Sequence, residues 1–480
     1  MSIDDVMNIA PSVTEGEKAL KLFTDRHEFI RLFSQYLNDD IPKEKILFFY
    51  GDGGNGKSLL LKFLRQNCCK YFSREVWQQI KDESDTEFVA HFKSNQVESY
   101  IAIPSVLIDF SQNIGIESAQ DPFYGLLMLR RNLQKISTEL NYRLRFPLYD
   151  FACIWYLHKK GKSPEEIKSL FPLTEIAGSI TSIIDAVSQS AIGAITKAVF
   201  DFFAKDLGEK FTIYLAKIGL SEDRIKSICN KDLDTELIYE LPKLFAEDLK
   251  AVMEDIAAPK RVVLFFDTHE SFWGEQKKLS DVLFFEKDEW FRRLLRALPF
   301  ESGVIVVAAG RESPRWADAN NVSPNTEIPL SFLHAKEVGN LSEADAKSYL
   351  EQVEITDIDL CQSLIAYANV DVNQVHPLYL GLGADVVLQA KKQGKSLTAS
   401  DFKNIPDAEN KSNVLINRLL KYVSRDMVYA VHALSACRMF DFELYRKLAQ
   451  ELDFQPTRSD FDTLVDFSFV WQIEQKDKDC

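Results

Sequence analysis

Short apolar runs alternate along the chain with longer segments in which apolar residues recur every three or four positions. Four runs predict strands, at residues 46–50, 105–110, 261–267 and 303–310. The first, ILFFY, lies between Lys45 and Gly51, as expected of a strand that is buried on both faces. Segments of helical period at 16–38 and 288–298 accompany the strands. Strands that alternate with helices predict an α/β fold with a doubly wound parallel sheet.

A long segment between the second and third strands has mostly helical period, so we expect a large helical insertion at about 112–250. Within it, residues 176–203 carry few charges, but Ser, Thr, Asp185 and Lys197 interrupt the apolar stripe. A membrane-spanning helix would be apolar all round for about 20 residues. We therefore interpret 176–203 as an amphipathic helix packed in the protein interior, with a partner-docking or lipid-facing surface as the alternative.

The composition indicates a soluble globular protein, with 46% apolar and 27% charged residues among 480. The net charge of −15 disfavours binding to a phosphate backbone, and we find no basic stripe that would compensate for it. The seven cysteines are scattered without a CxxC pair, and the acidic N-terminus lacks the features of a secretory signal. These features favour a cytoplasmic protein that contains no structural zinc site.

The segment after the first strand, GDGGNGKS at residues 51–58, is typical of a phosphate-binding loop (P-loop) between a strand and a helix. The glycines let backbone N–H groups approach phosphate oxygens, and the following helix adds its positive end. Lys57 supplies a charge for the β- and γ-phosphates, and Ser58 a hydroxyl for Mg²⁺. The predicted nucleotide-binding residues here are Gly51, Asp52, Gly53, Gly54, Asn55, Gly56, Lys57, Ser58 and Leu59.

Acidic residues follow the third predicted strand in the sequence DTHE. Asp267 is placed to hold Mg²⁺ through water, and Glu270 to polarise the attacking water. The alternative is a polar strand end with satisfied carboxylates, and we expect His269 to be a structural neighbour. Arg311 follows the fourth strand and is placed to contact the γ-phosphate, unless it is an ordinary surface arginine. The predicted catalytic residues are thus Lys57, Asp267, Glu270 and Arg311.

Two further segments are candidates for contact with the base. Arg26 lies in FTDRHE just before the core, and Pro377 lies in HPLYL in the later helical region. A proline ring at the start of an apolar helix can stack on adenine. Simple helix initiation is the alternative, because proline is common in the first turn of helices.

In this order, FTDR, FFYGDGGNGKS, VVLFFDTHE, VVAAGRE and HPLYLGL resemble the STAND class of signal-transduction ATPases, which includes the NACHT and AP-ATPase groups. The resemblance covers most of the chain outside the insertion. It implies a switch between ATP and ADP states that controls self-association, with Mg²⁺ at Ser58 and Asp267. It further implies that Arg311 is the sensor arginine and that Pro377 touches the base. Bacterial members often serve in signalling or antiviral defence.

The resemblance also implies a division into domains. We expect a helical lead-in at 1–45, a P-loop NTPase domain at 46–330, a helical lid at 331–408 and a winged-helix-like domain at 409–480. The lid would begin with the capping pattern Ser342–Asp345 in the helix at 341–353. The winged-helix likeness stops after a single strand at 468–475, which predicts either a curtailed wing or a natural protein that continues further.

The leading hypothesis is therefore an ATP-hydrolysing switch, with ATP and an unidentified protein trigger or effector as partners, and no membrane. A DNA-acting AAA-type ATPase, such as an initiator or a helicase loader, is one alternative, against which the net charge counts. A scaffold that holds ADP without hydrolysing ATP is another.

Overall fold

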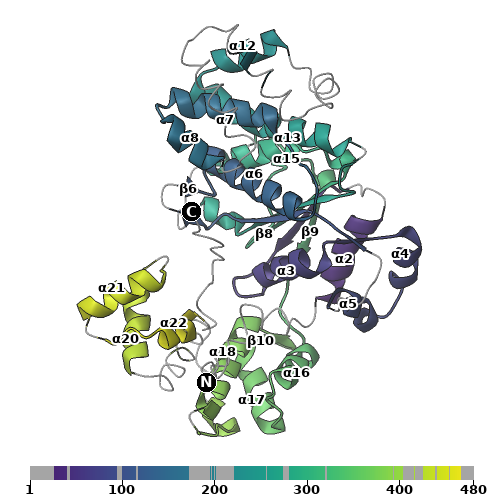
Figure 1. Cartoon of the computed structure of the whole chain (residues 1–480). Coiled ribbons are helices and arrows are strands. Elements are labelled where there is room, and N and C mark those ends of the chain that lie inside the picture. Colours follow the sequence, from purple (N-terminus) through teal and green to yellow (C-terminus); the bar gives the residue numbers. More distant parts are fainter. Residues whose placement is uncertain are drawn as a thin grey trace. The chain divides into compact units, whose positions relative to one another are not determined.

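A computed structural model provides the structure of the chain (Figure 1). It describes residues 26–39, 44–93, 100–114, 117–171, 221–255, 257–273, 281–318, 322–392, 394–403, 425–437, 440–452 and 454–465, with single residues at 195, 197, 198, 201, 414 and 416. The chain divides into two compact units. We call residues 28–50 and 64–337 the sheet unit, and residues 1–27, 51–63 and 338–480 the loop-and-lid unit.

The sheet unit is built on a five-stranded sheet in which every pairing is parallel, in the order β4-β7-β8-β1-β9. Its strands are β1 (Ile46–Tyr50), β4 (Ser105–Asp109), β7 (Val262–Asp267), β8 (Val304–Gly310) and β9 (Leu333–Glu337). The four strands predicted from apolar runs are confirmed to within one residue at each end. The chain therefore has a mixed α/β fold around a parallel sheet, as expected.

The fifth strand, β9, was not predicted. It pairs with β1 alone and lies at the edge of the sheet, with residues that are partly or fully exposed. Its sequence, LHAKE, contains no continuous apolar run, because an edge strand is not buried on both faces. The periodicity that reveals central strands is therefore missing here.

Helices cover both faces of the sheet. Successive strand residues point to opposite faces, so a strand in which every residue is apolar must be buried on both. Ile46 and Phe48 belong to a core shared with α6 (Pro122–Glu139), α13 (Ile238–Met253) and α15 (Glu289–Ala297). On the other face, the Phe29 ring of α2 (His27–Asn38) meets the Phe49 ring edge-on, with ring centroids 5.4 Å apart.

The described part of the predicted insertion is mostly helical. Besides α6 and α13, it contains α7 (Pro147–Lys159), α8 (Pro164–Leu170) and α12 (Glu222–Asn230), with a short hairpin of β5 (Asn113–Ile114) and β6 (Glu117–Ser118). Most of the amphipathic helix predicted at 176–203 lies outside the described residues. None of the helices described has the length and apolar character that crossing a membrane requires. The remaining elements of the sheet unit are α4 (Arg74–Ile80), α5 (Asp85–Lys93), α14 (Asp281–Lys287), β2 (Lys70–Phe72) and β3 (Tyr100–Ala102).

The loop-and-lid unit has its own hydrophobic core. Its elements are α3 (Lys57–Phe63), α16 (Glu343–Gln352), α17 (Ile358–Ala368), α18 (Pro377–Lys392), α20 (Arg425–Leu434), α21 (Phe442–Leu452), α22 (Arg458–Val465) and the pair β10 (Asn369–Asp371) and β11 (Gln374–Val375). The predicted cap of α16 is present, since the Ser342 side chain accepts a hydrogen bond from the Asp345 N–H. The strand predicted at 468–475 lies outside the described residues, and the domain borders stay predictions.

Candidate nucleotide-binding site

The P-loop leaves β1 after Tyr50 and ends where α3 begins at Lys57. This is the predicted succession of strand, glycine-rich loop and helix. The Lys57 ammonium is buried and donates hydrogen bonds to the carbonyls of Gly51 and Asp52, each at 2.7 Å. These two bonds tie the end of the loop to its beginning. They place the positive charge beside the first two carbonyls of the loop.

Three glycines of the loop adopt backbone conformations that other residues rarely adopt. Gly51 has a φ angle of +146°, and Gly54 and Gly56 have φ angles of +88° and +82°, in the left-handed region. A side chain in this region costs about 1–2 kcal/mol. Backbone amides that turn in this way form concave surfaces that bind anions. The sequence GDGGNGKS thus provides glycine where the loop turns.

Three polar side chains bind the backbone of this loop and of the segment that follows β9. The Arg26 guanidinium donates to the carbonyls of Asn55, at 3.2 Å, and of Gly339, at 2.7 Å. The Asn55 side chain donates to the Val338 carbonyl at 3.1 Å. An imidazole nitrogen of His376, Nε2, lies 3.2 Å from the Gly53 carbonyl. Arg26 therefore lies against the loop, and its role in nucleotide binding stays a prediction.

Pro377 is the first residue of α18. This position satisfies the helix-initiation alternative, because proline lacks the N–H that a first turn leaves unpaired. The adjacent His376 stacks on the Tyr379 ring, with ring centroids 4.3 Å apart. The start of α18 thus brings His376 to the loop, a residue that sequence reasoning missed. The stacking of Pro377 on a base stays a prediction.

In the sheet unit, β7 ends at the buried Asp267, and the chain then turns sharply. We call Asp267–Glu270 the acid turn. The Asp267 carboxylate accepts a hydrogen bond from the Thr268 N–H at 2.8 Å. Thr268 has a φ angle of +58°, which is a strained conformation for a β-branched residue. Such strain persists only when surrounding contacts fix it.

The structure brings two of the predicted catalytic residues together. The Arg311 guanidinium donates to one carboxylate oxygen of Glu270 at 3.1 Å, and the Arg311 backbone N–H donates to the other at 3.2 Å. Arg311 is the first residue after β8, and its side chain is more than half exposed. The Arg311 guanidinium and the Glu270 carboxylate thus lie together at the carboxyl ends of β7 and β8, and both are accessible to a ligand.

His269, the residue between Thr268 and Glu270, is buried in a polar and aromatic cluster. Its Nε2 lies 3.0 Å from an oxygen of Asp288, which also accepts a hydrogen bond from the Trp316 indole at 2.8 Å. The other oxygen of Asp288 pairs with the buried Arg292 at 3.2 Å. This agrees with the expected structural role of His269. Its partners Asp288 and Trp316 were not predicted, because nothing in their local sequence marks them.

A second carboxylate lies at the neighbouring strand end. Asp109 ends β4, is buried, and is in register with Asp267 of β7. One of its oxygens accepts a hydrogen bond from the Ser111 N–H at 2.8 Å. Sequence reasoning identified this strand but not its last residue as a site candidate. The signal was present, since an apolar run that ends in Asp occurs in both SVLID and VVLFFD.

The residues expected to bind Mg²⁺ have suitable chemistry. Mg²⁺ prefers oxygen ligands and keeps several waters when it is bound together with phosphates. The Ser58 hydroxyl and the Asp267 carboxylate are such ligands, although they belong to different units and their joint contact with Mg²⁺ stays a prediction. Among the described residues, no group of three or more His, Cys, Asp or Glu side chains is placed to hold a metal.

The adjacent thiols of Cys68 and Cys69 do not add reactive groups. Both are buried, and burial raises the pKa of the Cys69 thiol to about 12 and that of Cys68 well above its usual value. A protonated, buried thiol is neither a nucleophile nor a metal ligand. Neither thiol is therefore a candidate for the functional site.

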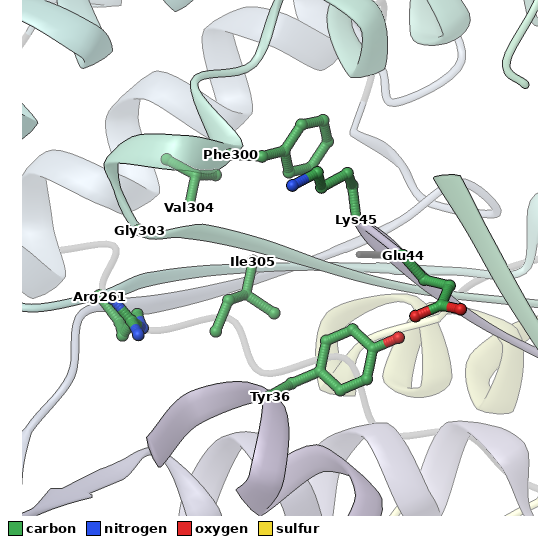
Figure 2. A pocket seen from close by; sticks show the side chains of 8 residues that line it. All are labelled: Tyr36, Glu44, Lys45, Arg261, Phe300, Gly303, Val304 and Ile305. Carbon is green, nitrogen blue, oxygen red and sulfur yellow. The ribbon is translucent and has the colours of Figure 1, made fainter. Parts of the chain in front are cut away.

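A small cavity lies at the amino ends of the strands. Tyr36, Lys45, Arg261, Phe300 and Ile305 are among the residues that line it, and Figure 2 shows their side chains around it. Its volume of about 10 Å³ has room for a single water molecule. Ligands of parallel α/β sheets bind instead beyond the carboxyl ends of the strands, where Asp267 and Arg311 lie.

Comparison with known proteins gives no independent assignment of this site: no protein-family model matches the chain, and no curated protein is significantly similar to it in sequence.

Proposed function

We propose that this protein is an ATP-binding and ATP-hydrolysing molecular switch of the STAND type. The observation that carries the proposal is the pairing of Lys57 with the first two carbonyls of a glycine-rich loop that follows a parallel β-strand. A buried lysine in a loop whose glycines turn the backbone amides is suited to a nucleotide phosphate chain. The proposal extends to the acid turn and Arg311.

In this mechanism the loop amides and Lys57 bind the β- and γ-phosphates of ATP. Ser58 and Asp267 would hold Mg²⁺, which neutralises charge that develops on the phosphates. Glu270 orients a water molecule and accepts its proton as the water oxygen bonds to the γ-phosphorus. The bond to the β-phosphate oxygen breaks, which gives ADP and inorganic phosphate.

Arg311 has a second role in this proposal. Its guanidinium pairs with Glu270 and is exposed enough to contact a γ-phosphate. Contact with the γ-phosphate distinguishes ATP from ADP, and a switch needs only such a difference in affinity between two conformations. We propose that the ATP state favours self-association. Signalling or antiviral defence in the cytoplasm is the setting that the family resemblance suggests.

Nucleotide binding is tested with Lys57→Ala, with Lys62→Ala on the same helix as the matched control. Isothermal titration with ATP and ADP should show binding to the wild type and to Lys62→Ala. Removal of the Lys57 ammonium should weaken binding by about 100-fold, the upper range for a hydrogen-bonded charge. Equal affinity of Lys57→Ala and the wild type would refute the loop assignment.

Hydrolysis is tested separately with Glu270→Gln, with the exposed Glu312→Gln as control. Loss of a general base lowers the turnover rate by about 100-fold or more. The affinity for ATP should change little, because the loop is intact. If Glu270→Gln releases phosphate at the wild-type rate, Glu270 is not the base. A wild type that binds ATP but never releases phosphate would instead be a nucleotide-holding scaffold.

A further inference from the structure

The hydrogen bonds of Arg26, Asn55 and His376 all involve one short stretch of the P-loop, residues 53–55. Arg26 binds the carbonyl at one end of this stretch, and His376 lies against the carbonyl at the other. The Asn55 side chain extends from the stretch to the Val338 carbonyl. We call these three residues the loop clamp.

The clamp consists of buried groups rather than surface contacts. Arg26 is 7% exposed, Asn55 3% and His376 9%. Arg26 also has a φ angle of +81°, a strained backbone conformation for a residue with a side chain. A charged donor that is buried and bound to two carbonyls fixes both of them, because loss of either bond would leave a polar group unsatisfied.

Close backbone contacts reinforce these bonds. A methyl group added to Gly54 would lie 2.6 Å from His376, and one added to Gly51 would lie 2.5 Å from the Val338 carbonyl. Glycine at these two positions is therefore required by the neighbouring segments as well as by an approaching phosphate. The loop cannot change its backbone path without disturbing Val338 and His376.

The clamp also lies at three of the four places where the chain passes from one unit to the other. The chain leaves the loop-and-lid unit after His27, re-enters it at Gly51, leaves it again after Phe63 and re-enters it at Val338. Arg26, the loop and the Val338–Gly339 segment lie directly beside the first, second and fourth of these passages. The start of α18 joins them through His376.

We infer that Arg26, Asn55 and His376 are positioning residues that couple the P-loop backbone to the Val338–Gly339 segment and to α18. The inference rests on the proposed nucleotide binding and adds a route by which occupancy of the loop reaches the lid. Phosphate bound to the amides of residues 53–56 stabilises the backbone path that the clamp requires. Nucleotide binding should therefore favour an ordered start of α18, and an ordered start of α18 should favour nucleotide binding by the same free energy.

The central test compares Arg26→Gln with Arg31→Gln. Arg31 is a suitable control because its guanidinium also binds backbone carbonyls, those of Lys81 and Glu83, but in the sheet unit. Arg26→Gln should raise the dissociation constant for ADP about 10-fold or more, in the range of a charged hydrogen bond. Arg31→Gln should leave it unchanged.

Hydrogen exchange of the full chain distinguishes this coupling from a purely structural role of Arg26. In the wild type, ADP should slow amide exchange in residues 378–392 of α18. In Arg26→Gln at saturating ADP, this added protection should be lost or reduced. Unchanged ADP affinity together with unchanged protection would overturn the clamp.

His376→Phe tests the clamp independently if Arg26→Gln does not fold. His376→Phe preserves a ring that can stack on Tyr379 but removes the group that contacts the Gly53 carbonyl. ADP affinity should fall about 3- to 10-fold, as for a neutral hydrogen bond, and the protection of α18 should fall with it. Where both variants fold, their combined effect on affinity should be smaller than the product of the single effects, because both disturb one backbone path.

The outcomes separate the clamp from the proposed function. Wild-type protein that binds neither ADP nor ATP would refute the proposed function, and the clamp with it. Wild-type protein that binds ADP, with variants that bind it equally well and keep the protection of α18, would refute the clamp alone.

Discussion

The P-loop and the acid turn are both short segments with positive φ angles, but they are fixed in different ways. Lys57 and Arg26 bind main-chain carbonyls of the loop, and the Asn55 side chain of the loop binds the Val338 carbonyl. The acid turn is fixed through side chains, because His269 is anchored on Asp288 and Glu270 on Arg311. Both segments depend on side chains from distant parts of the chain. In the loop these side chains bind main-chain carbonyls, whereas in the acid turn they bind other side chains.

This difference predicts that a substitution in one segment leaves the function of the other intact. Damage to the loop should remove nucleotide affinity, whereas damage to the acid turn should remove hydrolysis and leave affinity intact. The following predictions test this separation, from the largest expected effect to the smallest.

Removal of Mg²⁺ should have the largest effect. Chelation with EDTA should lower the hydrolysis rate by about 1,000-fold or more, because charge on the transferring phosphate is then not neutralised. ADP affinity should fall much less, since the loop amides and Lys57 need no metal. Phosphate release and ADP titration with and without EDTA measure both, and added Mg²⁺ should restore the rate. Full hydrolysis in EDTA would contradict the role given to Ser58 and Asp267.

Asp288→Asn should have the next largest effect, on stability. Asp288 is the buried counter-ion of Arg292 and an acceptor for His269 and Trp316. Removal of its charge should lower the free energy of unfolding by about 3–5 kcal/mol, since Arg292 is left buried without a partner charge. Urea denaturation measures the change. Asp85→Asn, which breaks the exposed pair with Arg31, is the control and should cost at most about 1 kcal/mol.

His269→Asn should lower the turnover number by about 10- to 100-fold, because a small displacement of Glu270 misaligns the attacking water. The dissociation constant for ADP should stay within about 3-fold of the wild type, since the side-chain contacts found for His269 lie within the sheet unit. His91→Asn, a change to a partly exposed histidine of α5, is the matched control. A parallel loss of affinity and turnover in His269→Asn would show that the two segments do not fail separately.

The same difference explains how far the sequence could be interpreted. The central strands and the loop follow from local patterns, namely continuous apolar runs and the spacing of Gly51, Gly56 and Lys57. The edge strand β9 lacks an apolar run and was missed. Asp109 had a visible signal at its strand end that was not used.

The partners of the candidate site could not be predicted in this way. Asp288, Trp316 and His376 are brought to the acid turn and to the loop by packing between segments far apart in the chain. The local sequence around each of them is typical of an ordinary helix or loop. Only the fold reveals which backbone and side-chain groups they contact.

The smallest expected effect concerns the fit of the loop against His376. Gly54→Ala should lower the free energy of unfolding by about 2 kcal/mol, part from the φ angle of +88° and part from the contact with His376. Gly394→Ala is the control, because Gly394 has a φ angle of +70° but open space around it, and should cost about 1 kcal/mol. Adding His376→Ala to Gly54→Ala should recover the contact part of the loss, which urea denaturation of the single and double variants would resolve. Equal losses in Gly54→Ala and Gly394→Ala would mean that backbone strain alone requires glycine here. The loop would then be linked to the start of α18 through the contact between His376 and the Gly53 carbonyl, and not through the fit of Gly54.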